Sequence, residues 1–466
     1  MLIAIELMWQ GCVHVFVALL VAVSAAVASV ASSPQIQVPE IDISPLLQPS
    51  TPATQAAREE VWQAVSHALS HTGLFLLTGH GWSQQFLDDC FSASTAIFEM
   101  PEQQKQALKM PLHRMRGYIP FGEESGLKDS VFEPKEGFAY GFDYHQGGGA
   151  DTCDSASTST STSTSTSTSS SSDGDGSINT DGVPVPVRMP AYPTDDYASV
   201  PVSADADADG SNYLKAANVW PEPEQLPLAG RASLEELFRR KARLAELLVA
   251  PLLDGEGAIA VAGDSDSGSD GVEWESSSSE LLAGGDAISV MRLFHYLPVS
   301  GTTATTNTMD SSSGSGDGSS KAVLGSSAHT DWGLLTLILQ DGVGGLEWLP
   351  RQVPLPGQVP TQGQGDQWHP VPCVPGSLVV NAGDFLSLLR PAYHSPIHRV
   401  VSPTVRERLS FVFFYYPAYD TPLPEAGAGA GAGGMLQFNT LLRDSRGGGG
   451  SFGDFIVQKW HGVAAY

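Results

Sequence analysis

Residues 328–339 read AHTDWGLLTLIL. The apolar half of this stretch is short, rich in branched side chains and followed by the glycine-rich residues 341–345, a pattern typical of a buried β-strand that ends in a turn. If the extended backbone reaches back through the first half, His329 and Asp331 point the same way, because alternate side chains of a strand share a face. One imidazole and one carboxylate on one face are two of the three ligands of a 2-His-1-carboxylate metal site.

A third ligand of the right type follows downstream, where His398 opens the β-branched run HRVV. The chain holds 12 His and 51 acidic residues, so about one His-x-Asp is expected by chance. The prediction of a metal site therefore depends mainly on His398. His394 is a rival ligand, and the four-residue spacing of His394 and His398 also suits a helical zinc pair. Pro396 lies between them and disfavours that helix.

The segment 408–417, RLSFVFFYYP, predicts a strand that is covered on both faces, since alternate positions are apolar on each side. Arg408 and Ser410 are its polar exceptions. A buried guanidinium requires an anionic partner. The planar guanidinium of Arg408 beside the hydroxyl of Ser410 suits the binding of a carboxylate ligand. The alternative is an internal salt bridge to an Asp or Glu of the chain.

Taken together, His329-x-Asp331, His398 and Arg408-x-Ser410 resemble the catalytic signature of the 2-oxoglutarate/Fe(II)-dependent dioxygenases, in their isopenicillin N synthase-like branch. The resemblance implies that the first three side chains bind the metal. It also implies that Arg408 and Ser410 bind the distal carboxylate of 2-oxoglutarate.

Further segments extend this resemblance. MRLFHYLP (291–298) is similar to the family strand that precedes the metal motif, which implies a 2-oxoglutarate contact for Tyr296. Phe294 is a departure, because the plant members usually carry Asn there. The segments 368–372 and 375–384 are similar to the middle strands of the family.

The implied fold is mainly β with flanking helices, namely a double-stranded β-helix (jelly roll) core with an α/β N-terminal region. The implied cofactors are Fe(2+), 2-oxoglutarate and O2, with ascorbate as a reductant. The expected reaction oxidises, above all hydroxylates, a C–H bond of a small organic molecule and releases succinate and CO2. Two alternatives stay open: a 2-oxoglutarate-independent isopenicillin N synthase-like oxidase, and a catalytically silent jelly-roll binding module.

Low-complexity tracts suggest how the chain is divided. Residues 36–145 are expected to form the N-terminal dioxygenase region, and residues 216–466 the Fe(II)/2-oxoglutarate dioxygenase domain. The Ser/Thr/Asp-rich residues 147–211 are expected to be a disordered insertion, because they cannot bury enough apolar surface to offset chain entropy. Shorter low-complexity insertions are expected at 255–285, 300–320 and 426–434.

Residues 1–33 form an apolar segment that suits either a targeting signal or a membrane anchor. Small residues at 29–31 resemble a signal-peptidase site, whereas the segment contains Glu6 and no Lys or Arg. Residues 1–33 could therefore direct the protein to the secretory pathway or attach it to a membrane. An organelle and the cytoplasm are the alternative locations. A membrane is a partner only if the segment is retained as an anchor.

The formal net charge of −27 argues against nucleic acid as a partner, because binding it depends on neutralised phosphates. Four cysteines without Cys-x-x-Cys spacing argue against a disulfide framework. The expected partner is a small-molecule substrate, and the sequence carries no signal for the oligomeric state.

Overall fold

The computed structural model describes residues 37–110, 115–124, 132–142, 214, 216–254, 288–299, 323–351, 367–423 and 450–464. The predictions for residues 1–33, 147–211, 255–285, 300–320 and 426–434 concern parts of the chain outside these ranges. Within the described ranges, every helix is too short or too polar to cross a membrane.

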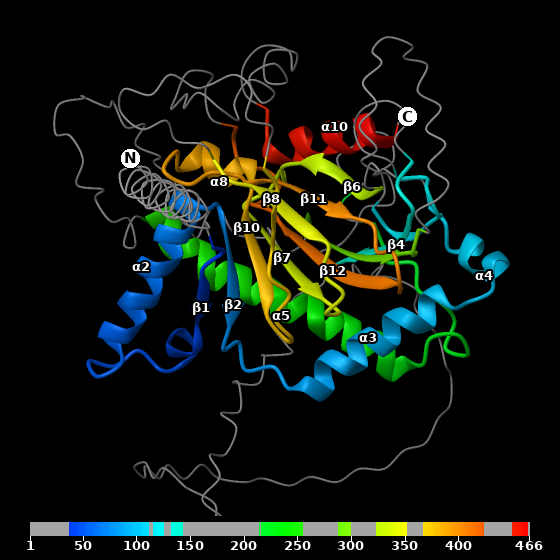
Figure 1. The fold of residues 1–466 in the computed structure, drawn as a ribbon, viewed down its shortest axis with the longest axis horizontal. Helices are drawn as coiled ribbons and strands as arrows, with labels where there is room; N and C mark the ends of the chain where they lie inside the picture. Colours follow the sequence, from blue (N-terminus) through cyan, green and yellow to red (C-terminus); the bar gives the residue numbers. More distant parts are fainter. Residues whose placement is uncertain are drawn as a thin grey trace, which may run out of the picture.

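Two β-sheets form the centre of the fold (Figure 1). The larger sheet has the strand order β1 (Glu40–Asp42), β2 (Leu74–Thr78), β10 (Leu378–Ala382), β7 (Leu335–Gln340), β12 (Arg408–Tyr415), β5 (Val290–Tyr296), β4 (Lys135–Gly141) and β3 (Gly117–Ile119). The smaller sheet has the order β6 (Leu324–His329), β11 (Ile397–Val401), β8 (Leu346–Leu349) and β9 (His369–Pro370). Neighbouring strands are antiparallel, except that β1 is parallel to β2.

The two sheets pack face to face around one buried apolar cluster. Phe294 and Ile338 of the larger sheet belong to this cluster, as do Trp348 and Val400 of the smaller sheet. Burying both inner faces against each other is the stable arrangement for two sheets that each have one apolar face. The core is the double-stranded β-helix, and the predicted fold class is confirmed.

Helices cover the outer face of the larger sheet. Phe411 of β12 stacks on Phe91 of α3 (Gln84–Phe98) with the ring centroids 4.6 Å apart. Phe413 meets Phe238 of α5 (Leu228–Asp254) edge to face at 5.1 Å. The described part also contains η1 (Ser44–Leu47), α2 (Gln55–His71), α4 (Glu102–Ala107) and α8 (Asp384–Leu389). Both faces of β12 are therefore covered, as its sequence pattern predicted.

The last helix, α10 (Phe452–Ala464), packs beside the end of β6 (Figure 1). Its Trp460 contacts Trp332 edge to face at 5.0 Å, and its Phe452 contacts Phe385 in α8 at 4.8 Å. This helix therefore lies against the segment that follows His329.

Candidate active site

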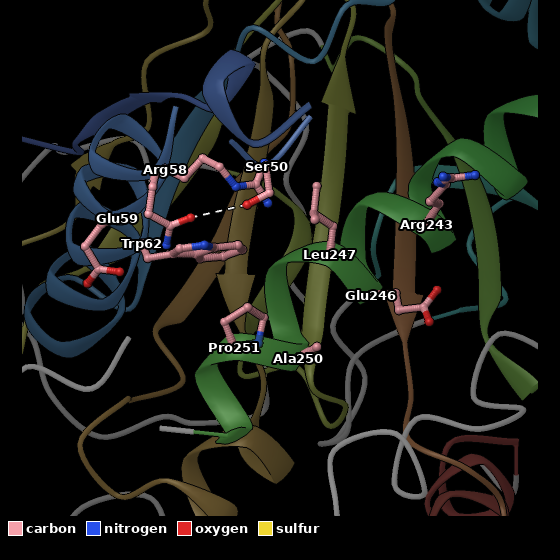
Figure 2. Close-up of a pocket in the computed structure, with 10 residues that line it drawn as sticks. Ser50, Arg58, Glu59, Trp62, Arg243, Glu246, Leu247, Ala250 and Pro251 are labelled. Carbon is pink, nitrogen blue, oxygen red and sulfur yellow. Dashed lines mark hydrogen bonds between the residues drawn. The ribbon is translucent and has the colours of Figure 1, made fainter. Parts of the chain in front are cut away.

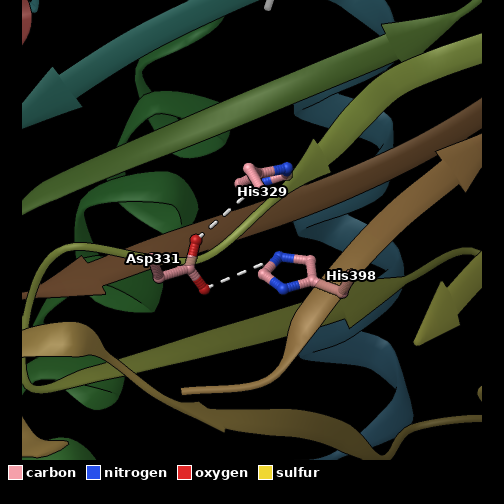
Figure 3. Close-up of side chains that lie close together, drawn as sticks. All are labelled: His329, Asp331 and His398. Carbon is pink, nitrogen blue, oxygen red and sulfur yellow. Dashed lines mark ion pairs between the residues drawn. The ribbon is translucent and has the colours of Figure 1, made fainter. Parts of the chain in front are cut away.

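Three side chains from two separate stretches converge at one end of the smaller sheet: His329, Asp331 and His398 (Figure 3). One ligand atom from each lies within 4.8 Å of the others. His329 Nε2 lies 3.8 Å from Asp331 Oδ1, and His398 Nε2 lies 3.7 Å from Asp331 Oδ2. The structure thus brings together the three residues that were predicted to bind a metal.

The way in which Asp331 reaches this position differs from the prediction. We expected His329 and Asp331 to lie on the same face of one strand. Instead, β6 ends at His329, and Asp331 lies in the turn before β7. The Asp384 backbone N–H donates to the Asp331 carbonyl at 2.7 Å. The Thr330 hydroxyl donates to the Asp384 carboxylate at 3.0 Å. The turn, and not strand alternation, therefore aims the Asp331 carboxylate.

Backbone carbonyls fix the tautomer of both imidazoles. His329 Nδ1 lies 2.6 Å from the Ser327 carbonyl oxygen, and His398 Nδ1 lies 3.0 Å from that of Pro396. A carbonyl oxygen only accepts, so each Nδ1 carries the proton and donates. The lone pair of each Nε2 is then directed at the Asp331 side, which is the arrangement that metal-binding histidines use.

The chemistry of this donor set fits a divalent metal ion. Asp331 is 4% exposed, and its Oδ2 has no hydrogen-bond donor among the described residues. Burial and the neighbouring His398 lower the pKa of His329 to about 4, which keeps the ring neutral at physiological pH. A buried carboxylate and two neutral imidazoles, without a thiolate, suit a metal such as Fe(II) that needs open coordination positions.

A buried ion pair supports the His329 side of the cluster. Glu133 is paired with Lys135, and Glu133 Oε1 accepts from the Ser327 backbone N–H at 2.6 Å. The Ser327 carbonyl is the group that accepts from His329 Nδ1. Sequence reasoning did not identify Glu133, because its partner lies almost two hundred positions further along the chain and no spacing pattern connects the two.

Arg408 is buried without a carboxylate of the described chain within ion-pair distance. It is 1% exposed, and its partners are all neutral. The guanidinium donates to the Gly344 carbonyl at 2.6 Å, to Gln340 Oε1 at 2.9 Å and to Ser410 Oγ at 3.2 Å. The internal salt bridge that we considered for Arg408 is therefore absent from the described residues.

Tyr296 lies beside Arg408, because the two residues are directly opposed in the register of β5 and β12. The Arg408 guanidinium carbon lies 4.7 Å from the centroid of the Tyr296 ring, a cation–π distance. Ser410 is opposed to Phe294 in the next inward-facing row. Phe294 packs in the cluster between the sheets, so apolar packing occupies the position at which plant members of the resembling family usually carry Asn.

Two other histidines, His80 and the rival ligand His394, take no part in the cluster. His80 Nε2 instead donates to the Gly376 backbone carbonyl at 2.6 Å. His394 lies outside any helix, and among the described residues the only metal-competent group is the one with His329, Asp331 and His398. The helical zinc pair, which Pro396 disfavoured, does not form, because residues 394–396 are not helical and His398 lies in strand β11.

Two further polar groups near the site were not anticipated. Gln340 and Gly344, which hold Arg408, lie at the end of β7 and in the turn after it. Arg292 faces the barrel interior on β5 and binds Glu124 at 2.6 and 2.5 Å. Burial alone would raise the pKa of Glu124, but Arg292 and Lys135 outweigh it and lower that pKa below its usual range. Each of these pairs joins residues that lie far apart in the sequence, so no motif predicted the contacts.

A separate cleft of about 500 Å³ lies between α2 and α5, on the helical side of the larger sheet (Figure 2). Its lining includes Arg58, Trp62, Glu246 and Pro251. None of the clustered metal-competent residues and none of the contacts of Arg408 lines it. This cleft is therefore distinct from the candidate active site.

Comparisons with known proteins agree with the geometry. Residues 288–417 match the family model of the 2OG-Fe(II) oxygenase superfamily, and residues 38–155 match that of the non-haem dioxygenase in morphine synthesis N-terminal region. A 2-oxoglutarate-dependent dioxygenase of Didymella fabae is 28% identical over 385 residues, which span 81% of this chain and 84% of that one. A homoarginine-6-hydroxylase of Glycine max is 26% identical over 390 residues, 82% of this chain and 86% of that one.

Solved structures resemble the fold. A full-length Neurospora crassa protein, crystallised in complex with alpha-KG, superposes with a TM-score of 0.56 at 17% identity, covering 92% of this chain and 98% of that one. A putative 2OG-Fe(II) oxygenase family protein from Caulobacter crescentus gives a TM-score of 0.52 at 19% identity, covering 91% and 99%.

The chain belongs to the 2-oxoglutarate/Fe(II) oxygenase superfamily. It is an oxidoreductase of the 2-oxoglutarate-dependent dioxygenase type, with Fe(II) and 2-oxoglutarate as cofactors and a small molecule as substrate. The superfamily predicted from the sequence is confirmed, and the narrower assignment to the isopenicillin N synthase-like branch stays a prediction.

Proposed function

We propose that His329, Asp331 and His398 bind Fe(II), and that Arg408, Ser410 and Tyr296 bind 2-oxoglutarate, in a dioxygenase that hydroxylates a C–H bond of a small organic molecule. The convergence of three ligand atoms within 4.8 Å, inside a family fold, is the observation that carries this proposal. When bound, Fe(II) and 2-oxoglutarate supply O2 activation, which is coupled to the release of succinate and CO2.

The chain's contribution is to hold the ligands in a fixed geometry. The Ser327 and Pro396 carbonyls hold the Nδ1 protons of His329 and His398, so both Nε2 atoms stay available to the metal. The backbone bond from Asp384 restrains the turn that carries Asp331. With three protein ligands, a bound metal would keep coordination positions free for its co-substrates.

Arg408 supports the assignment of the second site. This guanidinium is 1% exposed, and its partners among the described residues are all neutral, so its charge is not balanced by that part of the chain. Such a charge is costly in the interior unless an anion joins it. The distal carboxylate of 2-oxoglutarate provides that anion, with the Ser410 hydroxyl as a further donor and the Tyr296 ring packed beneath the guanidinium.

The same observation distinguishes this proposal from an oxidase that does not use 2-oxoglutarate, because Arg408 would then lack a counter-ion among the described residues. The test is the release of succinate from 2-oxoglutarate under air with Fe(II), screened over small-molecule substrates. Succinate release that rises with one class of substrate supports the proposal. Substrate oxidation without succinate supports the oxidase, and the absence of both reactions supports a silent binding module.

A further inference from the structure

Asn381 in β10 is a buried polar side chain without a hydrogen-bond partner in the described part of the chain. Asn381 is 1% exposed, and neither its Oδ1 nor its Nδ2 has a hydrogen-bond partner among the described residues. Buried amides are almost always hydrogen-bonded, because removing them from water without a partner is unfavourable. The side chain therefore requires an explanation that the backbone fold does not supply.

The direction of the Asn381 side chain follows from strand alternation. Val379, two residues earlier, packs in the cluster between the two sheets. Val380 and Ala382, its immediate neighbours, belong to the cluster on the helical side. Because residues i and i+2 of a strand share a face, the Asn381 amide points into the barrel interior.

The end of β10, which carries Asn381, leads toward the cluster of His329, Asp331 and His398. Just beyond Asn381, the Gly383 N–H donates to the Leu334 carbonyl at 2.9 Å and the Asp384 N–H donates to the Asp331 carbonyl at 2.7 Å. The strand thus leads directly into the backbone that carries Asp331. Asn381 is opposed to Thr336 in β7, close to where that strand leaves the turn.

The facing sheet presents a second donor of the same kind. Trp348 in β8 is 1% exposed, belongs to the interior cluster and has no hydrogen-bond partner for its Nε1 among the described residues. It is opposed to His398 in the register of β11 and β8, so the two side chains share the inner face. Asn381 in the larger sheet and Trp348 in the smaller sheet thus each have a donor without a partner among the described residues. This indicates that a polar ligand binds between the two sheets.

We propose that Asn381 is a further 2-oxoglutarate-binding residue, whose Nδ2 donates to the carboxylate nearest the metal. This inference rests on the proposed function, in which Arg408 and Ser410 bind the opposite carboxylate. Each end of the dicarboxylate then meets a donor of the chain, and a neutral amide adds to the site without changing its charge.

Three variants test the inference against wild type, all loaded anaerobically with Mn(II) in place of Fe(II). Asn381→Leu replaces the amide with an apolar group of similar size, and Asn381→Asp keeps the shape but adds a negative charge. Ser94→Ala is the matched control, because Ser94 in α3 is also buried and its hydroxyl also has no partner in the described part of the chain, but it lies on the helical side. The measurements are the 2-oxoglutarate dissociation constant, by calorimetry, and the thermal midpoint without ligand.

We expect Asn381→Leu to weaken 2-oxoglutarate binding about ten- to hundredfold, the range for a lost hydrogen bond to a charged group. Its midpoint without ligand should be equal to that of wild type or higher, because an unsatisfied amide has been removed. Asn381→Asp should weaken binding at least as much, since two carboxylates repel. Ser94→Ala should leave the dissociation constant unchanged.

An unchanged dissociation constant in Asn381→Leu, with a lower midpoint, would overturn the inference and assign the amide a structural role through bound water. If the leucine variant does not fold, an unchanged dissociation constant in the isosteric Asn381→Asp has the same consequence. Wild-type protein that binds Mn(II) but not 2-oxoglutarate would instead contradict the proposed function. The two failures are therefore distinguishable.

Discussion

The imidazoles of His329 and His398 lie with their ring centroids 4.4 Å apart, on residues that are directly opposed in the register of β6 and β11. A slip of one residue would turn one imidazole to the outer face of the sheet. The metal-competent cluster is thus a property of strand pairing between segments that lie far apart in the chain. Only Asp331 depends on a local turn.

Substitution of Asp331 tests the carboxylate ligand. We expect Asp331→Ala to lose Fe(II) binding and all succinate release, because two imidazoles alone bind a divalent ion weakly. Metal content after anaerobic loading and desalting is the measurement. Asp89→Ala, which removes an exposed carboxylate on α3, should retain one iron per chain. Full iron in Asp331→Ala would contradict the assignment.

Substitution of Arg408 tests the second site. Arg408→Ala should weaken 2-oxoglutarate binding by about 1.5–3 kcal/mol, the usual contribution of a hydrogen bond to a charged group. Metal content should stay at the wild-type level, because Arg408 contacts none of the three clustered residues. Arg239→Ala on the exposed side of α5 removes a surface ion pair with Glu236 and should bind 2-oxoglutarate as wild type does. An unaltered dissociation constant in Arg408→Ala would remove this residue from the site.

The burial of Lys241 leads us to expect that the free energy of unfolding depends on pH. It is fully buried on α5, and its Nζ donates to the Phe411 and Leu337 carbonyls at 2.7 and 3.1 Å. Burial lowers the pKa of Lys241 in the folded chain well below the ordinary value of 10.5. Between the folded and unfolded pKa values the unfolded chain binds the extra proton, so the free energy of unfolding rises with pH.

The variant Lys241→Met removes this titration. Relative to it, wild type should gain about 1.4 kcal/mol of unfolding free energy per pH unit over that window. Chemical denaturation of both proteins at several pH values measures the difference. A difference that does not vary with pH would mean that Lys241 is charged in the folded state.

Much of the site was predictable because its residues lie in short motifs. Residue type and spacing singled out His329, Asp331, His398, Arg408 and Ser410, the resemblance to the family implied their roles, and the structure brings the first three together. The local geometry of Asp331 was not predictable, because the apolar pattern of a strand does not show at which residue the strand pairing ends. Here β6 ends at His329, where the turn begins.

Other parts of the site left no sequence signal, because burial of a position does not reveal its partner. The pattern of β10 shows that Asn381 is inside the sheet, but not that its amide lacks a partner among the described residues. The bond from Ser327 to Glu133, and the bonds from Arg408 to Gln340 and Gly344, depend on contacts between distant segments. Only the folded chain shows them.

Anaerobic titration of the protein with Fe(II) and then 2-oxoglutarate tests the central claim most directly, because a chelated 2-oxo acid on Fe(II) has a visible charge-transfer band. The account predicts that the band appears with one equivalent of each in wild type and is lost in Asp331→Ala. Wild-type protein that binds Fe(II) and shows no band on saturation with 2-oxoglutarate would contradict it.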